Sequence, residues 1–228
     1  MCGRYTLSAP ERLEGAFPQF RFPKLTPRYN IAPSTPVLAV RNTGSDEAEF
    51  LEWGFIPSWS AGEQGTLVHI NARAETVATK PAFRDSLRSR RAVIFADGYY
   101  EWAKGAGTAK QPYWISRADR APFTFAALWD DWYDPNGSER HTCAIVTMDA
   151  TDELAWIHDR MPVILDAGAR ERWLSTDSLD APEAETLLLP RSQHWVTTPV
   201  STAVNRAWRD DDPALIEPVK PPEQESLF

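Results

Sequence analysis

The chain has 228 residues, of which 43% are hydrophobic and 25% charged, enough to bury the core of one moderate domain or of two small ones. Its formal net charge of −8 argues against a protein that coats nucleic acid by charge alone. Residues 1–110 nevertheless hold 14 Lys and Arg against 11 Asp and Glu, so a basic face within an acidic protein is one interpretation and an ordinary solvated surface is the other. With no apolar run of about eighteen residues and no recognisable secretory signal, we expect a cytoplasmic monomer without membrane contact.

The elements expected along the chain are short. Apolar periodicity that follows a proline or a polar residue predicts helices, and β-branched or aromatic runs bounded by turn residues predict strands. Four prolines predict a loop over residues 23–36. Helices are expected at residues 11–17, 80–90, 152–158, 169–174 and 181–189. Strands are expected at residues 37–41, 49–53, 67–75, 91–102, 112–116, 122–132, 141–148, 161–165 and 194–198, with Asp97-Gly98 interrupting the fourth.

This order of elements predicts an α+β fold. Many short strands in succession favour a single domain with a curved, mainly antiparallel and barrel-like sheet flanked by short helices. No glycine-rich phosphate loop appears, which argues against a doubly wound nucleotide-binding fold. We expect the domain to cover residues 1–210, and the acidic, proline-rich residues 211–228 to form a disordered tail.

The two cysteines have different surroundings. Cys143 lies in an apolar, β-branched run and is expected in the core. Cys2 becomes the first residue once Met1 is removed, and it then carries an α-amine with a pKa of about 8 and a thiol with a pKa of about 8.5. Such an amine condenses with an aldehyde, and the thiol can close a thiazolidine ring; an N-terminal cysteine can also be an amide-hydrolase nucleophile, or the residue is incidental. If Met1 is retained, the amine lies in a peptide bond and no thiazolidine can form.

Three further segments carry polar side chains suited to chemistry. In an extended segment, Asn71 and Arg73 share one polar face that either lines a cleft or is solvated. Glu101 follows a buried strand among aromatic residues, where burial raises the pKa of a carboxyl, although an exposed or salt-bridged Glu is the alternative. His158 lies at a junction between elements, where Asp159 can orient it for proton transfer or where it is a surface histidine. No paired Cys/His spacing predicts a metal site, and no cofactor is expected.

Seven segments, in this order, resemble the SRAP family of SOS-response-associated peptidases, also called abasic-site processing proteins. They are MCGRY at 1–5, YNIAPS at 29–34, WGFIPSW at 53–59, NARAET at 71–76, KPAFR at 80–84, GYYEW at 98–102 and IHDRMP at 157–162. The resemblance implies a covalent thiazolidine between Cys2 and the ring-opened sugar of an abasic site in single-stranded DNA. It also implies roles for Asn71 in holding the sugar and the Cys2 end, for Glu101 in ring opening and for His158 in forming and reversing the Schiff base.

The resemblance further implies a set of residues that contact DNA. Arginines are expected on phosphates, and tryptophans with the proline loop at 30–36 are expected to hold the strand and its bases. The set is Arg4, Asn30, Pro33, Trp53, Trp59, Arg73, Arg84 and Arg160. On the expected helix at 80–90, Arg84, Arg88 and Arg91 have the spacing of one face, which predicts either a phosphate-binding edge or an ordinary basic face.

Two other functions remain open from the sequence. One is a thiol peptidase whose N-terminal Cys2 processes its own leader or other proteins. The other is a non-catalytic reader of modified DNA bases that uses some of the ten tryptophans as a cage.

Overall fold

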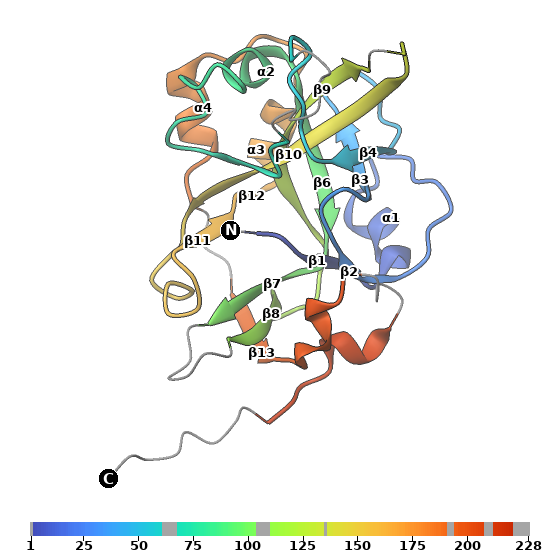
Figure 1. Cartoon of the computed structure of the whole chain (residues 1–228), viewed down its shortest axis with the longest axis vertical. Helices are drawn as coiled ribbons and strands as arrows, with labels where there is room; N and C mark the ends of the chain where they lie inside the picture. The colour runs from blue at the N-terminus through green and yellow to red at the C-terminus, as the bar shows by residue number, and fades with distance from the viewer. Residues whose placement is uncertain are drawn as a thin grey trace.

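The computed structural model describes residues 2–60, 68–103, 110–134, 136–190, 194–207 and 212–220. Two sheets, one of them curved into a barrel, make up most of this structure, and short helices lie around them (Figure 1). The expected α+β fold with a barrel-like sheet is therefore confirmed.

The larger sheet closes on itself. Strand β10 pairs with β9 on one side and, in parallel, with β4 on the other, so the circuit β10-β4-β3-β6-β9 returns to its first strand. Valine, isoleucine, leucine and aromatic side chains fill it, which suits strands that are buried on the barrel's inner face. The circuit consists of β3 (Pro36–Arg41), β4 (Glu49–Trp53), β6 (Arg91–Ala96), β9 (Phe123–Tyr133) and β10 (Glu139–Asp149), to which β5 (Asn71–Arg73), β11 (Arg160–Pro162) and β12 (Ile164–Leu165) add.

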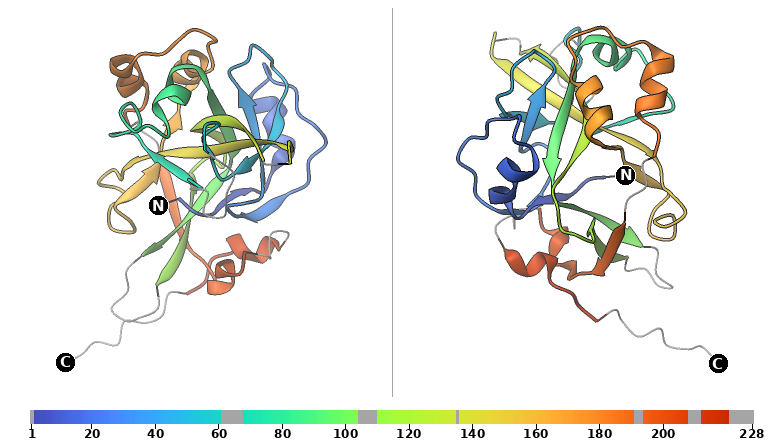
Figure 2. Two further views of the ribbon diagram at one scale, coloured as in Figure 1. Left: turned by 45° about the horizontal axis from the view of Figure 1, so that its top comes forward. Right: turned by 180° about the vertical axis from the view of Figure 1, so that it is seen from behind.

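The smaller sheet lies against one end of the barrel (Figures 1 and 2). Its strand order is β13-β8-β7-β1-β2. The chain passes from β6 in the barrel to β7 in this sheet at Asp97-Gly98. A Cβ atom on Gly98 would lie 2.2 Å from Nε1 of Trp114, so only glycine permits this close approach. The strands are β1 (Tyr5–Leu7), β2 (Arg28–Ile31), β7 (Gly98–Ala103), β8 (Gln111–Arg117) and β13 (Trp195–Pro199).

The helices are short and peripheral. Asp166 and Asp180 cap α3 and α4 by accepting hydrogen bonds from backbone N–H groups in the first turn. The α-helices are α1 (Leu13–Ala16), α2 (Arg84–Ser89), α3 (Ala167–Trp173) and α4 (Ala181–Leu187), and the 3₁₀ helices are η1 (Pro10–Arg12), η2 (Thr202–Asn205) and η3 (Pro213–Ile216).

Several expected elements differ from the structure. The predicted loop at 23–36 contains β2, because its prolines lie outside Arg28–Ile31 and leave those residues free to pair with β1. The predicted helix at 152–158 is a series of turns, closed by bonds such as Ile157 N–H to the Leu154 carbonyl at 2.9 Å. Of the extended segment expected at 67–75, residue 67 lies outside the described residues, Asn71–Arg73 form β5, and His69 makes an isolated bridge with Phe55.

The segment after residue 210 is not wholly irregular. Residues 213–216 form η3, and Leu215 is buried in a second apolar cluster with Tyr100 and Trp114. The expectation of a disordered tail is therefore wrong for this part, whereas 211 and 221–228 lie outside the described residues. No helix in the described ranges is long and apolar enough to span a membrane.

Candidate active site

Cys2 lies three residues before β1, and its side chain is fully buried. Strand β1 runs antiparallel to β7, with Tyr5 opposite Tyr99. The Tyr100 N–H donates to the Arg4 carbonyl at 3.0 Å, so the segment before β1 continues alongside β7. This pairing brings Cys2 to the part of β7 that carries Glu101.

Asp97 anchors the start of the chain. This buried carboxylate accepts four hydrogen bonds: from the Thr6 hydroxyl at 2.6 Å, from the Ser8 N–H and hydroxyl at 2.6 and 2.8 Å, and from the Ala9 N–H at 2.8 Å. Bonds to an ionised acceptor are stronger than neutral ones. The N-terminal strand is therefore tied to the β6–β7 junction and cannot shift freely relative to Glu101. Sequence reasoning missed this role because the Asp-Gly pair was interpreted only as a break in a strand.

Asn71 contacts Cys2 directly. Its side-chain amide donates to the Cys2 carbonyl at 3.0 Å. Strand β5 holds Asn71 in place by parallel pairing with β10, where Asn71 lies opposite Ile145. The side-chain oxygen Oδ1 of Asn71 is buried and accepts no hydrogen bond within the described parts of the chain. It is thus an acceptor available to a ligand that reaches Cys2.

Glu101 is only 2% exposed. Burial raises the pKa of its carboxyl to about 7, against an ordinary value of 4.5. Its Oε2 lies 4.0 Å from Nε2 of His158. A carboxyl with this pKa can both give and take a proton near neutrality.

His158 is oriented by its own turn. Its Nδ1 accepts a hydrogen bond from the Arg160 N–H at 2.9 Å, which leaves the proton of the neutral ring on Nε2, the nitrogen nearer Glu101. Asp159 lies 2.8 Å from Nδ1 and can pair with that nitrogen only when the ring is protonated, so its orienting role stays a prediction. Burial lowers the pKa of His158, so the neutral ring is favoured near pH 7.

The structure therefore brings the four candidate catalytic residues to one place, although they are far apart in the chain. Burial, reinforced by the charge of Glu101, raises the pKa of the Cys2 thiol. In this environment the thiol needs hydrogen-bond donors to react as a thiolate. A buried acceptor from Asn71 and a proton-transfer pair from Glu101 and His158 surround it, an arrangement suited to covalent addition with proton transfer.

The arginines expected to contact phosphates near this site differ in whether their guanidinium groups already pair with carboxylates. Arg73 is exposed on β5, two residues from Asn71, and Arg4 is half-buried next to Cys2. Within the described ranges neither pairs with a carboxylate. Arg160 is more constrained: its guanidinium donates to Glu75 at 2.8 and 3.0 Å and to Asp149 at 2.5 Å. A phosphate contact by Arg160 therefore stays a prediction and competes with two carboxylates.

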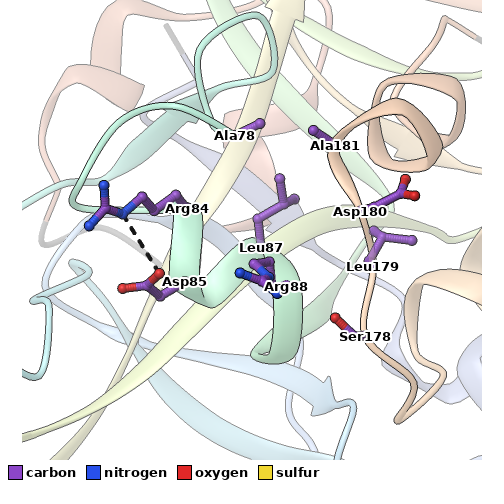
Figure 3. Close-up of a pocket in the computed structure, with 9 residues that line it drawn as sticks. All are labelled: Ala78, Arg84, Asp85, Leu87, Arg88, Ser178, Leu179, Asp180 and Ala181. Atoms are coloured by element: carbon purple, nitrogen blue, oxygen red, sulfur yellow. Dashed lines mark ion pairs between the residues drawn. The ribbon is translucent and has the colours of Figure 1, made fainter.

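The arginines expected on one helix face divide into two groups. Arg84 and Arg88 lie on α2 and line a hollow of about 580 Å³ that Asp180 also borders, and Arg84 pairs with Asp85 at 3.7 Å (Figure 3). Arg91 is instead fully buried in β6, and its guanidinium donates to the backbone carbonyls of Trp173, Leu87, Arg88, Ser175 and Asp177. Its inclusion in a phosphate-binding edge is wrong, because α2 ends at Ser89 and the chain then turns into the barrel.

The remaining candidate DNA contacts also divide by burial. Trp59 is 65% exposed and Pro33 is half-buried, so both can reach a ligand. Trp53 is fully buried and donates from Nε1 to the Ile70 carbonyl at 2.8 Å; the expected base contact is wrong for this side chain. Asn30 is 1% exposed and donates to the carbonyls of Val204 and Arg206, which indicates a structural role rather than a strand contact.

An aromatic pair near Glu101 was not among the expected residues. Trp156 is 55% exposed, and its ring lies edge-on to Tyr113 at 5.0 Å between centroids. Tyr113 is the β8 partner of Glu101, so the pair lies at the edge of the candidate site. The sequence signal for it was a tryptophan two residues before His158, whose exposure only the structure reveals.

Cys143 is fully buried in β10, as expected. The one group of possible metal ligands in the described residues is Asp131, Glu139 and His141, whose ligand atoms lie within 4.8 Å of one another. Asp131 already pairs with His141 at 2.6 Å and with Arg41 at 3.4 Å. The nearby guanidinium disfavours a cation there, so this cluster gives no reason to assign a metal.

Comparison with known proteins identifies the family. A family model described as SOS response associated peptidase (SRAP) matches residues 1–207. The chain belongs to the SRAP family. It is 42% identical to Abasic site processing protein YoaM of Bacillus subtilis, over 83% of this chain and 86% of that protein. It is 35% identical to Abasic site processing protein YedK of Escherichia coli, over 96% of this chain and 100% of that protein.

The fold agrees with this SRAP assignment. A crystal structure of a protein from Bacteroides thetaiotaomicron superimposes with a TM-score of 0.82 at 26% identity, covering 96% of this chain and 100% of that one. The resemblance of seven short segments thus extends to nearly the whole chain. The four residues gathered at the start of β1 all lie within the SRAP match.

Proposed function

We propose that this SRAP protein binds abasic sites in single-stranded DNA and joins them covalently to Cys2 as a thiazolidine, which shields the strand from cleavage. The observation that carries the proposal is the arrangement around Cys2. Asn71 holds the Cys2 carbonyl at 3.0 Å, while Glu101 and His158 form a pair 4.0 Å apart beside it. The relatives YoaM and YedK, both named abasic site processing proteins, support the choice of substrate.

The chemistry requires that Met1 has been removed. The α-amine of Cys2 attacks the aldehyde carbon of the ring-opened sugar, a C–N bond forms, and the carbonyl oxygen takes a proton from Glu101. The nitrogen returns a proton to the Glu101 carboxylate, the hydroxyl takes that proton up and leaves as one water, and the C=N bond of a Schiff base forms. The thiolate adds to the imine carbon, a C–S bond forms, and the C=N electron pair returns to nitrogen. The sum is one water released, with no oxidation or reduction.

Glu101 and His158 supply the proton transfers. With its pKa raised to about 7, Glu101 is protonated in a large share of molecules near neutrality and can protonate the departing oxygen. The neutral His158 ring beside it can relay a proton to or from Glu101 during formation and reversal of the Schiff base. Asn71 fixes the Cys2 backbone and offers Oδ1 to a sugar hydroxyl.

Ring closure explains why a thiol stands beside the amine. A Schiff base alone permits β-elimination at the sugar and breakage of the strand. Closure by sulfur removes the imine, so the phosphodiester backbone survives. A sugar without its base also leaves room for the chain end to approach, and a single strand can bend sharply at that point.

The DNA strand would be held by charge and by stacking. Arg4 and Arg73 lie next to Cys2 and Asn71 and have no carboxylate partner in the described residues, so they are the first candidates for the flanking phosphates. The exposed ring of Trp59 can stack on a base, which contributes about 1–3 kcal/mol.

The test is incubation with an abasic single-stranded oligonucleotide, followed by denaturing electrophoresis. Wild-type protein should give a stable crosslink. The Cys2→Ala variant keeps an α-amine and should lose the stable crosslink, yet still bind undamaged strands. The control is Cys143→Ala, which removes the buried thiol of β10 and should crosslink normally.

A Cys2→Ala variant that still crosslinks would overturn the proposal. Cleavage of a peptide by wild-type protein without any crosslink would favour the thiol peptidase instead. Selective binding of modified bases, unchanged in Cys2→Ala, would favour a base reader.

A further inference from the structure

The hydroxyl of Tyr99 is a buried polar group that the chemistry above does not use. Tyr99 is fully buried, and its hydroxyl oxygen makes no hydrogen bond to any of the described residues. Buried hydroxyls nearly always have a partner, because an unsatisfied one costs free energy. We therefore expect the Tyr99 hydroxyl to have a hydrogen-bond partner at another stage of the reaction.

Its place on β7 points to the active site. Side chains alternate between the two faces of a strand, so Tyr99 and Glu101 share a face. That face belongs to the main core, which also contains Cys2, whereas Tyr100 faces the second apolar cluster. Tyr99 and Cys2 are thus on the same side of β7 as Glu101.

Packing restrains the ring of Tyr99. It meets the rings of Phe125 and Trp195 edge-on, with centroids 6.3 and 6.1 Å apart. Strand pairing with Tyr5 in β1 and Ile115 in β8 fixes the backbone on both sides. The hydroxyl can therefore rotate about its C–O bond, but the ring that carries it stays in position.

Burial raises the pKa of Tyr99, and the nearby ionisable groups Cys2, Glu101 and Glu153 raise it further. The hydroxyl consequently keeps its proton and acts as a hydrogen-bond donor. Cys2 lies three residues before Tyr5, the β1 residue that pairs directly with Tyr99, and it belongs to the same buried core.

We propose that the Tyr99 hydroxyl donates a hydrogen bond to the thiolate Sγ of Cys2 when the thiol is deprotonated for ring closure. Tyr99 is then a positioning and stabilising residue for the nucleophile, next to the backbone N–H of Arg4, which is the other donor to Cys2. The proton released by the thiol passes to the nitrogen of the Schiff base, which takes it up as the C=N electron pair returns to that atom, and the tyrosine keeps its own. This inference deepens the proposed function and rests on it for the step in which the thiolate acts.

The need for such a donor follows from the surroundings of Cys2. Burial and the charge of Glu101 both disfavour the thiolate. A buried anion is stabilised chiefly by donors that point at it.

The first experiment needs no DNA. Protein whose mass shows that Met1 is absent is treated with iodoacetamide between pH 6 and 10, and alkylation of the N-terminal peptide is followed by mass spectrometry. Tyr99→Phe should raise the pKa of the Cys2 thiol by about one unit. Below that pKa, the fraction of the thiol present as thiolate should therefore be about tenfold lower than in wild type. The matched control is Tyr100→Phe, which removes a hydroxyl bonded to the Tyr29 carbonyl at 2.7 Å on the opposite face and should leave the Cys2 titration unchanged.

Stability separates this role from a purely structural one. Removing an unsatisfied hydroxyl should leave the unfolding midpoint of Tyr99→Phe unchanged or higher, whereas Tyr100→Phe should lower it. A Cys2 titration identical in Tyr99→Phe and wild type would overturn the proposal.

A second experiment locates the step. With an abasic oligonucleotide, borohydride traps the Schiff base, and omission of borohydride reports the thiazolidine. Tyr99→Phe should form the trapped Schiff base at the wild-type rate and the thiazolidine about tenfold more slowly, in line with the smaller thiolate fraction. Equal slowing of both would contradict a role at sulfur. If wild-type protein forms no crosslink at all, the proposed function fails, while the alkylation experiment still decides the role of Tyr99.

Discussion

Replacing Glu101 by Gln should stabilise the protein at high pH and not at low pH. Glu101 is 2% exposed, and burial raises the pKa of its carboxyl to about 7 from 4.5. A raised pKa in the folded state means that folding favours the protonated form, so the stability linked to this group is fully present below pH 4.5 and is lost as the pH rises through 7. A rise from 4.5 to about 7 corresponds to about 3 kcal/mol.

The assay is urea unfolding of wild type and Glu101→Gln at pH 5 and pH 9. Glutamine has nearly the same shape and stays neutral, so at pH 5, just above the ordinary pKa of 4.5, the variant should be ahead by less than about 1 kcal/mol. At pH 9 the variant should be more stable by about 3 kcal/mol, because it avoids burying a charge. Titrating groups that do not interact with Glu101 cancel in the difference.

Glu185 provides the matched control. It is exposed on α4, and Glu185→Gln should change the free energy of unfolding by less than about 0.5 kcal/mol at either pH. A Glu101→Gln variant that is less stable than wild type at pH 9 would refute the reasoning, since the ionised carboxylate would then be stabilised by its surroundings. A difference that does not vary with pH would refute it as well.

Four other substitutions test separate parts of the account. Asp97→Ala should lower the free energy of unfolding by about 2–4 kcal/mol, measured by urea denaturation, because it leaves two backbone N–H groups without their acceptor. Arg91→Met should also destabilise the fold, by about 3 kcal/mol, yet leave the salt dependence of DNA binding unchanged. Arg73→Ala should reduce the slope of log affinity against log salt by about 0.7 without lowering the unfolding midpoint; an unchanged slope would remove it from the phosphate contacts. Trp59→Ala should weaken binding of undamaged single strands by about 1–3 kcal/mol in a fluorescence titration, and full retention of affinity would exclude stacking on this ring.

Local patterns in the sequence were sufficient for the fold class and for most strands. Runs such as residues 91–96 and 141–148 are apolar enough to predict buried strands, and they lie in β6 and β10. Short elements that depend on partners were missed. Strand β2 exists because β1 pairs with it, and the turns at 152–157 lack the continuous backbone bonds of the expected helix.

The candidate site could be assembled from the sequence only through resemblance. Nothing in the spacing of Cys2, Asn71 and Glu101 shows that β1, β5 and β7 bring them together. Burial explains the errors: Trp53 and Arg91 look like ligand contacts by residue type, but both make hydrogen bonds to backbone carbonyls inside the molecule. Conversely, the anchoring role of Asp97 depends on bonds to residues about ninety positions away, which no local pattern reveals.

The central claim is that the amine and the thiol of Cys2 act together on an abasic sugar. The most direct measurement is the mass of the N-terminal peptide from protein crosslinked to an abasic single-stranded oligonucleotide and then digested. The account predicts a peptide that begins at Cys2, carries the sugar fragment with the loss of one water, and resists alkylation at its thiol. A crosslink on a lysine, a free Cys2 thiol in the adduct, or a peptide that still begins with Met1 would contradict it.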